Sequence, residues 1–160
     1  MLTRRSALLA AGSALIVAGC GGRPARQIAG DTSDVPALGA ALEVERSQIA
    51  LYEIGAGLAS GREAELVRTI LAQERRHAAA LEEAIRELGG KPAPPRASSA
   101  YTRGIPHTLD AWRQHAIQAE EVWSAGYAAA IPKLANKRLR ATFGAMMTTE
   151  AEHAVALDVA

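Results

Sequence analysis

Apolar side chains recur every three or four residues along four long segments of the chain, the spacing of an α-helix with one buried face. The segments span residues 35–59, 60–88, 108–131 and 137–157. The positions predicted to face inward are Leu38, Leu42, Glu45, Ile49, Tyr52, Val67, Ile70, Glu74, His77, Leu81, Leu88, Ile117, Glu120, Trp123, Tyr127, Ile131, Leu139, Phe143, Met146, Glu150, His153 and Leu157. The pattern therefore predicts an all-α fold built from four helices.

Boundary signals agree with these segments. Asp34 is suited to cap the first helix, and Ser60 with Glu63 forms a capping box at the start of the second. The second helix is expected to end at the glycine pair 89–90, and Thr108 is suited to cap the third helix. Each predicted helix thus has a chemical reason to begin or end where the apolar pattern does.

The lengths of the connections predict the topology. Short connections at 59–60 and 132–136 fit two antiparallel hairpins, whereas residues 91–107 form a long connection rich in Pro, Ser and Gly. A connection of that length can run along the whole bundle and start the third helix parallel to the second. We expect a four-helix bundle of two antiparallel hairpins joined by a long crossover.

Six inward positions carry ionisable side chains in place of apolar ones. Two Glu-x-x-His pairs stand among them, and a glutamate precedes each pair by 29 or 30 residues. Residues three apart lie on one helix face, about one turn apart, so each pair can reach the same metal ion. The six candidate ligands are Glu45, Glu74, His77, Glu120, Glu150 and His153.

The spacing also places the six candidates at one height in the bundle. Glu45 and Glu74 lie equally far from the turn near residue 59, and Glu120 and Glu150 lie equally far from residue 135. Residues equidistant from the turn of an antiparallel hairpin lie side by side, here about 20 Å from its end. Burying four carboxylates costs several kcal/mol each unless the charge is compensated, and two divalent cations supply that compensation. The alternative is a metal-free bundle.

Neighbouring carboxylates compete for two of these roles. Glu43 points away from the stripe that contains Glu45, and Glu53 lies two turns further along. On the third helix, Glu121 competes with Glu120, which shares its face with Trp123 and Tyr127. The apolar pattern favours Glu120 and leaves Glu121 as the open alternative.

Two tyrosines repeat the spacing of the glutamates. Tyr52 and Tyr127 each follow a candidate glutamate by seven residues, which is two turns or about 10 Å. They are too far away to bind a metal beside that glutamate. Their default role is core packing with a satisfied hydroxyl, and the alternative is a hydrogen bond to a ligand or an electron relay.

Residues 1–19 are predicted to be an export signal. Arg4 and Arg5 precede a largely apolar run of twelve residues (7–18), too short to span a bilayer, and the start resembles a twin-arginine signal. Residues 17–20 resemble a bacterial lipobox, which would make Cys20 the lipid-modified first residue of the mature chain. Residues 20–33 would then be a tether and residues 34–160 the bundle. We expect an exported lipoprotein at the outer face of the cytoplasmic membrane, on the periplasmic or cell-surface side.

Composition excludes several classes of protein. The single cysteine excludes an internal disulfide framework and a four-cysteine iron site. Without Arg4 and Arg5 there remain 16 basic and 17 acidic residues, so nothing in the net charge favours nucleic acid.

The order Glu45, Glu74-x-x-His77, Glu120, Glu150-x-x-His153 resembles the ferritin-like superfamily of di-metal carboxylate proteins, and the likeness covers about residues 34–160. The resemblance implies two iron ions, with manganese or zinc as alternatives, that react with O2 or peroxide. It implies ferrous-iron oxidation or peroxide removal at an exported, membrane-tethered site. The absent cysteines depart from a rubrerythrin, and a lipid tether is awkward for a closed storage cage, whereas a homodimer is compatible with it.

Three functions follow from this pattern. The first is a di-iron or di-manganese oxidoreductase, and the second is a tethered metal carrier without turnover. The third is a structural bundle that has kept its ligands by descent. Because inward carboxylates are costly without cations, the pattern favours the first two.

Overall fold

A computed structural model describes residues 32–160 of the chain, so the predicted signal, Cys20 and all but the last two residues of the predicted tether lie outside the described residues. Its long helices are α1 (Val35–Leu58), α2 (Gly61–Glu87), α4 (Leu109–Ala130) and α5 (Lys137–Asp158). Shorter elements are the 3-10 helices η1 (Thr32–Asp34) and η2 (Ile131–Lys133) and the five-residue helix α3 (Ser98–Thr102).

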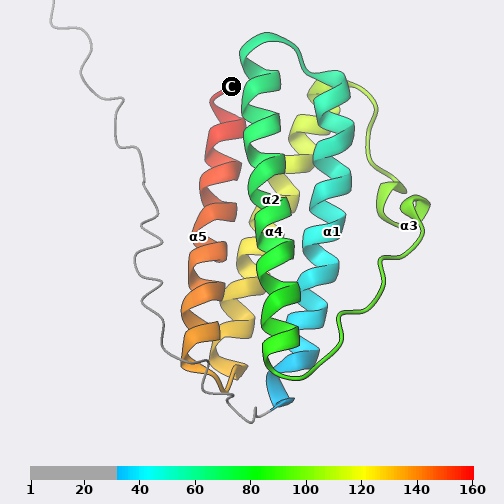
Figure 1. Ribbon diagram of the computed structural model, residues 1–160. Helices are drawn as coiled ribbons and strands as arrows, with labels where there is room; N and C mark the ends of the chain where they lie inside the picture. Colours follow the sequence, from blue (N-terminus) through cyan, green and yellow to red (C-terminus); the bar gives the residue numbers. More distant parts are fainter. Residues whose placement is uncertain (1–31) are drawn as a thin grey trace, which may run out of the picture.

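The four long helices lie side by side as a bundle (Figure 1). In that view α1 and α5 run upward, whereas α2 and α4 run downward, and the segment containing α3 passes along the outside of α1. The closest pairs are α1 with α2 and α4 with α5, which are the two hairpins. The predicted all-α topology is confirmed, including the third long helix parallel to the second.

The capping predictions were right about position but wrong about bonding. Asp34, Ser60 and Thr108 occupy the positions before α1, α2 and α4, yet none of their side chains bonds to its helix. Instead, the carboxylate of Asp34 accepts hydrogen bonds of 2.8 Å from the backbone N–H groups of Ala135 and Asn136. Asp34 therefore ties the start of α1 to the turn between the two halves of the second hairpin.

Two separate apolar clusters form the core, with a polar layer between them. Toward the start of α1, one cluster contains Leu38, Leu42, Leu81, Ile85, Tyr127, Phe143 and Met146. Toward the end of α1, the other contains Leu51, Tyr52, Val67, Ile70, Trp112, Ala116 and Leu157. Each cluster excludes water from one side of the polar layer, so groups in that layer experience a low dielectric.

The inward stripe differs from the predicted one at several positions. Ile49, Ile117, Trp123 and Ile131 are only half-buried, whereas Gln48, Trp112 and Ala116 are buried. Trp112 fits because its ring lies against Gly55 of α1, and its indole N–H donates to the carbonyl of Leu51 at 2.9 Å. Packing between helices, which periodicity does not describe, thus rotated the buried face of α4.

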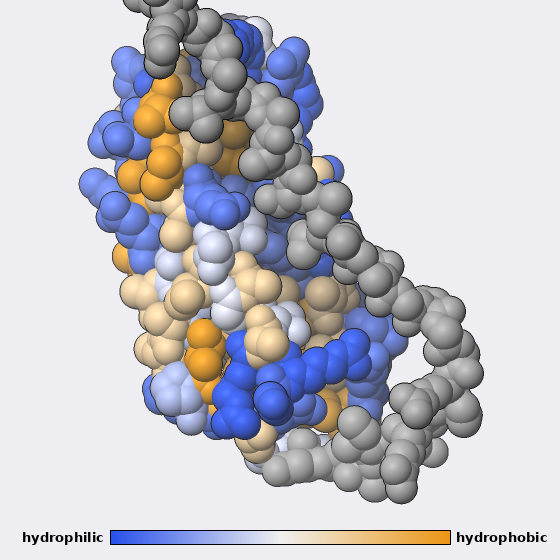
Figure 2. Space-filling view, turned by 90° about the vertical axis from the view of Figure 1, so that its left-hand side faces the viewer, coloured by the Kyte–Doolittle hydropathy of each residue, from blue (hydrophilic) through white to orange (hydrophobic). Residues whose placement is uncertain are grey.

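The surface of the bundle is unevenly polar. On the face where α5 lies, hydrophobic residues lie beside hydrophilic ones in the upper part, weakly polar residues fill the middle, and a group of strongly hydrophilic residues lies at the lower end (Figure 2). Among the described residues, no helix is long and apolar enough to cross a membrane.

Candidate metal centre

Four carboxylates meet in the polar layer, one from each long helix. Glu45 of α1, Glu74 of α2, Glu120 of α4 and Glu150 of α5 are each 0% exposed. All four belong to the predicted ligand set, and the competing Glu121 is exposed. Glu43 and Glu53 instead pair with arginines outside the layer, and His107 and His115 are exposed.

The six predicted ligands form two overlapping groups. Glu45 and His77 gather with Glu74 and Glu150, and Glu120 and His153 gather with the same two glutamates. Within each group, one potential ligand atom of every residue lies within 4.8 Å of the others. The structure thus has two candidate ion positions that share Glu74 and Glu150.

Each shared carboxylate presents one oxygen to each histidine. Oε2 of Glu74 lies 3.5 Å from Nδ1 of His77, and Oε1 lies 2.9 Å from Nδ1 of His153. Oε1 of Glu150 lies 3.3 Å from Nδ1 of His77, and Oε2 lies 3.7 Å from Nδ1 of His153. A carboxylate placed in this way can bridge two ions, whereas Glu45 and Glu120 each face one position.

Unpartnered polar atoms indicate that the site fits cations. Eight buried side-chain atoms of the described residues make no hydrogen bond of normal geometry, and seven of them belong to the six candidate ligands, several of which lie within ion-pair distance of one another. They include the Nδ1 atom of both histidines and both oxygens of Glu74. Buried polar atoms are nearly always satisfied in folded proteins. Carboxylate oxygens and imidazole nitrogens together suit iron, manganese or zinc.

The ionisation of the layer reflects the same unbalanced charge. Burial and the neighbouring carboxylates raise the pKa of Glu45 and Glu120 above the usual range of a glutamic acid. Burial by itself lowers the pKa of His77 and His153, but contacts with the glutamates outweigh it and raise both values. Without metal, the layer therefore retains protons, and a bound cation would displace them from the candidate ligands.

The tyrosines connect the two halves of the site. The hydroxyl of Tyr52 on α1 donates to Glu120 on α4, and the hydroxyl of Tyr127 on α4 donates to Glu45 on α1. Helical side chains lean toward the N-terminus of their helix, so each ring leans back toward the glutamate layer. Tyr52 and Tyr127 therefore pack in the core and also donate hydrogen bonds to candidate ligands.

Each tyrosine ring is held by another aromatic ring. Trp112 packs edge-on against Tyr52, with 5.7 Å between ring centroids, and Phe143 packs edge-on against Tyr127 at 5.0 Å. These contacts fix the rings and hence the hydroxyl groups that bond to Glu120 and Glu45.

Two glutamines of the site were missed by the sequence reasoning. Nε2 of Gln48 donates to Oε2 of Glu150 at 3.0 Å, and Oε1 of Gln73 lies 2.8 Å from Nε2 of His153. Gln48 follows Glu45 by three residues, the same spacing as in Glu-x-x-His, and that signal could have found it. An amide oxygen can only accept, so Gln73 favours a proton on Nε2 of His153 and leaves Nδ1 free to bind metal.

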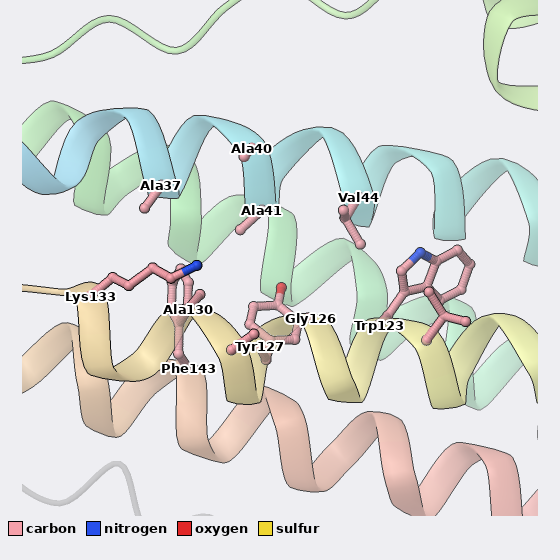
Figure 3. Close-up of a pocket in the computed structure, with 12 residues that line it drawn as sticks. Ala37, Ala40, Ala41, Val44, Trp123, Gly126, Tyr127, Ala130, Lys133 and Phe143 are labelled. Atoms are coloured by element: carbon pink, nitrogen blue, oxygen red, sulfur yellow. The ribbon is translucent and has the colours of Figure 1, made fainter.

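An apolar groove of about 570 Å³ runs between α1 and α4 and reaches Tyr127. Figure 3 shows Ala37, Ala41 and Val44 of α1 facing Gly126 and Ala130 of α4 across it. Tyr127 lines the groove, and its hydroxyl bonds to Glu45. The side chain of Tyr127 therefore lies between the groove and the candidate metal centre.

Comparison with known proteins is consistent with this geometry. The family model described as "Ferritin-like domain" matches residues 33–160. The chain belongs to the ferritin-like domain family. The structure of this ferritin-like domain is also similar to a crystal structure of a conserved hypothetical protein from Mycobacterium tuberculosis, with a TM-score of 0.71 and 20% identity. The similarity covers 80% of this chain and 96% of that chain, and at this identity it shows the fold alone. No curated protein matches the ferritin-like chain in sequence.

Proposed function

We propose that this ferritin-like protein binds two iron ions, or two manganese ions, and uses them to oxidise ferrous iron or to remove peroxide or O2. One observation carries the proposal. Two groups of ligand atoms share Glu74 and Glu150, and these groups contain seven of the eight unpartnered buried atoms of the described residues. Two adjacent cations satisfy such a set better than one.

Each residue has a distinct part in this function. Glu45 with His77, and Glu120 with His153, would each hold one ion, and Glu74 with Glu150 would bridge them. A bound iron or manganese pair would supply the electrons that reduce O2 or peroxide. The hydroxyl groups of Tyr52 and Tyr127 would hold Glu120 and Glu45 in place while the charge of the site changes.

The groove between α1 and α4 favours a small apolar oxidant. Its lining is almost entirely apolar, which suits the passage of O2 more than that of a charged molecule. Because Tyr127 lines the groove, the groove offers a path that ends one side chain from Glu45. Peroxide is small enough to use the same path.

We also propose that the protein is an exported lipoprotein. The basis is the sequence pattern alone: Arg4 and Arg5, the apolar run, and Cys20 after small residues. A twin-arginine route exports folded proteins, so the metals could be loaded inside the cell. Lipid on Cys20 would place the bundle at the outer face of the cytoplasmic membrane, where a closed cage is disfavoured and a homodimer remains compatible.

The deciding experiment is metal analysis of the natively exported protein, followed by anaerobic loading with ferrous iron and exposure to O2. We expect about two ions per chain and rapid oxidation that is lost in Glu74→Ala and kept in the exposed control Glu121→Ala. A metal content well below one ion per chain would overturn the proposal. Stoichiometric metal without oxidation above that of free iron would instead identify a metal carrier.

A further inference from the structure

The two halves of the site are alike in their ligands but different in the residues around them. Glu45 with Gln48 on α1 corresponds in spacing to Glu120 with Trp123 on α4. In the same way, Gln73 directly precedes Glu74 on α2, whereas Thr149 directly precedes Glu150 on α5. The hairpin of α1 and α2 therefore has two amide side chains next to its candidate ligands, whereas the hairpin of α4 and α5 has an indole and a hydroxyl at the corresponding positions.

Both amides lie on the side of the layer that contains His153. Helices α1 and α5 run antiparallel to α2 and α4 (Figure 1), so Gln48 and His153 are displaced from the glutamates that precede them by three residues toward the end of α1. Because α2 runs in the opposite direction, His77 is displaced from Glu74 toward the start of α1. The contacts agree, since Gln73 touches His153 and Gln48 donates to Oε2 of Glu150, the oxygen that faces His153.

Gln48 is only half satisfied. It is 0% exposed, its Nε2 donates to Glu150, and its Oε1 has no hydrogen-bond partner. Reversing the amide would place an oxygen against a carboxylate oxygen, so electrostatics fixes this orientation. An unsatisfied buried acceptor destabilises the fold, and a hydrogen-bond donor inside the site would remove that cost.

In the described part of the chain, the ion position beside His77 has no such amide groups next to it. The hydroxyl of Thr149 donates to the backbone carbonyl of Ala145 at 3.1 Å, and Trp123 is half-buried and lines the groove. The side chain of His77 is also more exposed than that of His153, 16% against 5%. The position beside His77 is thus the more open and less rigidly supported of the two.

We propose that Gln48 and Gln73 are positioning residues that make the ion position beside His153 tighter than the position beside His77. Gln73 fixes the ring of His153 with its Nδ1 toward the ion. Gln48 holds the adjacent oxygen of Glu150, and its Oε1 accepts a hydrogen bond from a water molecule in that half of the site. The inference rests on the proposed binding of two ions, and it makes the position beside His77 the one where metal exchanges.

Stepwise titration of the metal-free protein with Co²⁺, followed by calorimetry and by visible absorption, tests this inference. We expect a tight and a weak binding step in the unaltered chain. His77→Ala should remove the weak step and keep the tight one. Gln48→Leu and Gln73→Leu should each weaken the tight step by about 10–100-fold, the usual effect of losing a residue that orients a ligand. The exposed control Gln118→Leu should change neither step.

Thermal unfolding of the metal-free variants separates this role from simple packing. Leucine nearly matches glutamine in size, but it removes the amide that donates to the buried Oε2 of Glu150, so metal-free Gln48→Leu should unfold at a somewhat lower temperature while the tight Co²⁺ step also weakens. A lower unfolding temperature with unchanged Co²⁺ binding would mean that Gln48 acts only in packing, and would overturn the inference. Weakening of the step that His77→Ala removes would overturn it as well. If the unaltered chain binds no Co²⁺ at all, the proposed function itself fails.

Discussion

Glu74 and Glu150 differ from the other two buried glutamates in the number of ion positions that their oxygens face. Each presents one oxygen to His77 and the other to His153, whereas Glu45 faces only His77 and Glu120 only His153. Replacing a shared glutamate should therefore affect both positions, and replacing an unshared one should affect a single position.

We predict that Glu74→Gln loses most of its capacity for two ions, whereas Glu45→Gln retains about one ion per chain. Glutamine keeps the shape of the side chain but offers only one weakly binding oxygen, so the bridge is lost in the first variant alone. Elemental analysis after loading and desalting measures the ratio. Glu121→Gln is the matched control, because Glu121 is exposed on the same helix as Glu120. Equal metal loss in Glu74→Gln and Glu45→Gln would contradict the bridging role.

At the level of single residues, local spacing identified the candidate ligands but not the residues that hydrogen-bond to them. Glu-x-x-His places two side chains on one helix face wherever the helix lies, so the sequence could identify the pairs. The bonds of Tyr52 to Glu120 and of Tyr127 to Glu45 join residues 68 and 82 positions apart. Such contacts depend on how the two hairpins pack together, which no local pattern encodes.

Among the elements, α1 depends on a glycine for its contact with α4. A Cβ atom added to Gly55 would lie 2.1 Å from the ring of Trp112, whereas one added to Gly57 would meet nothing within 4 Å. Trp112 in turn packs against Tyr52, which bonds to Glu120. Gly55 therefore leaves room for Trp112, which packs against the tyrosine that bonds to Glu120.

We predict that Gly55→Ala lowers the free energy of unfolding by about 1–3 kcal/mol, the usual cost of overpacking a core. Gly57→Ala should raise it by about 0.5–1 kcal/mol, because alanine favours a helix over glycine. Urea denaturation followed by circular dichroism measures both. Stabilisation by both substitutions would show that Trp112 can move away from α1 at little cost.

The groove between α1 and α4 yields a prediction about the path of the oxidant. Gly126 lines the groove, and a Cβ atom there would meet nothing within 4 Å. Gly126→Leu should thus partly fill the groove, slow the oxidation of bound ferrous iron by O2, and leave the metal content unchanged. Stopped-flow absorption measures the rate, and Gly57→Leu on the exposed face of α1 is the control. An unchanged rate in Gly126→Leu would indicate that O2 enters elsewhere.

Across the whole molecule, the metal centre lies between two apolar clusters and joins all four long helices. When no cation is bound, these buried groups keep protons on Glu45, Glu120 and the two histidines, and burying such an ionisable layer costs folding free energy that a bound cation would offset. The proposed metal binding should therefore affect the stability of the entire bundle.

We predict that removing metal with a chelator lowers the unfolding temperature and that adding metal restores it. An ion present at 100 times its dissociation constant contributes about 2.7 kcal/mol per site, provided that the unfolded chain does not bind it. Differential scanning calorimetry with and without metal measures the change. The double variant His77→Ala/His153→Ala should show a much smaller response, and an equal response would place metal binding outside this site.

The sequence by itself determined the four helices, their order and the level of the bundle at which the six candidate ligands meet. It could do so because helical periodicity and distance from a turn are local properties of the chain, and Asp34, Ser60 and Thr108 marked the right positions for helix starts. The free-energy cost of burying four carboxylates then indicated that cations bind between them.

Only the tertiary structure decided how the α1–α2 and α4–α5 hairpins contact each other. It turned the carboxylate of Asp34 to the opposite hairpin, buried Gln48 in place of Ile49, and paired each tyrosine with the glutamate of the other half. It also showed that Glu74 and Glu150 are the shared pair and that one half of the site has two glutamines. These features arise from side chains of different helices competing for the same space and the same hydrogen-bond partners, and that competition exists only once the helices are packed.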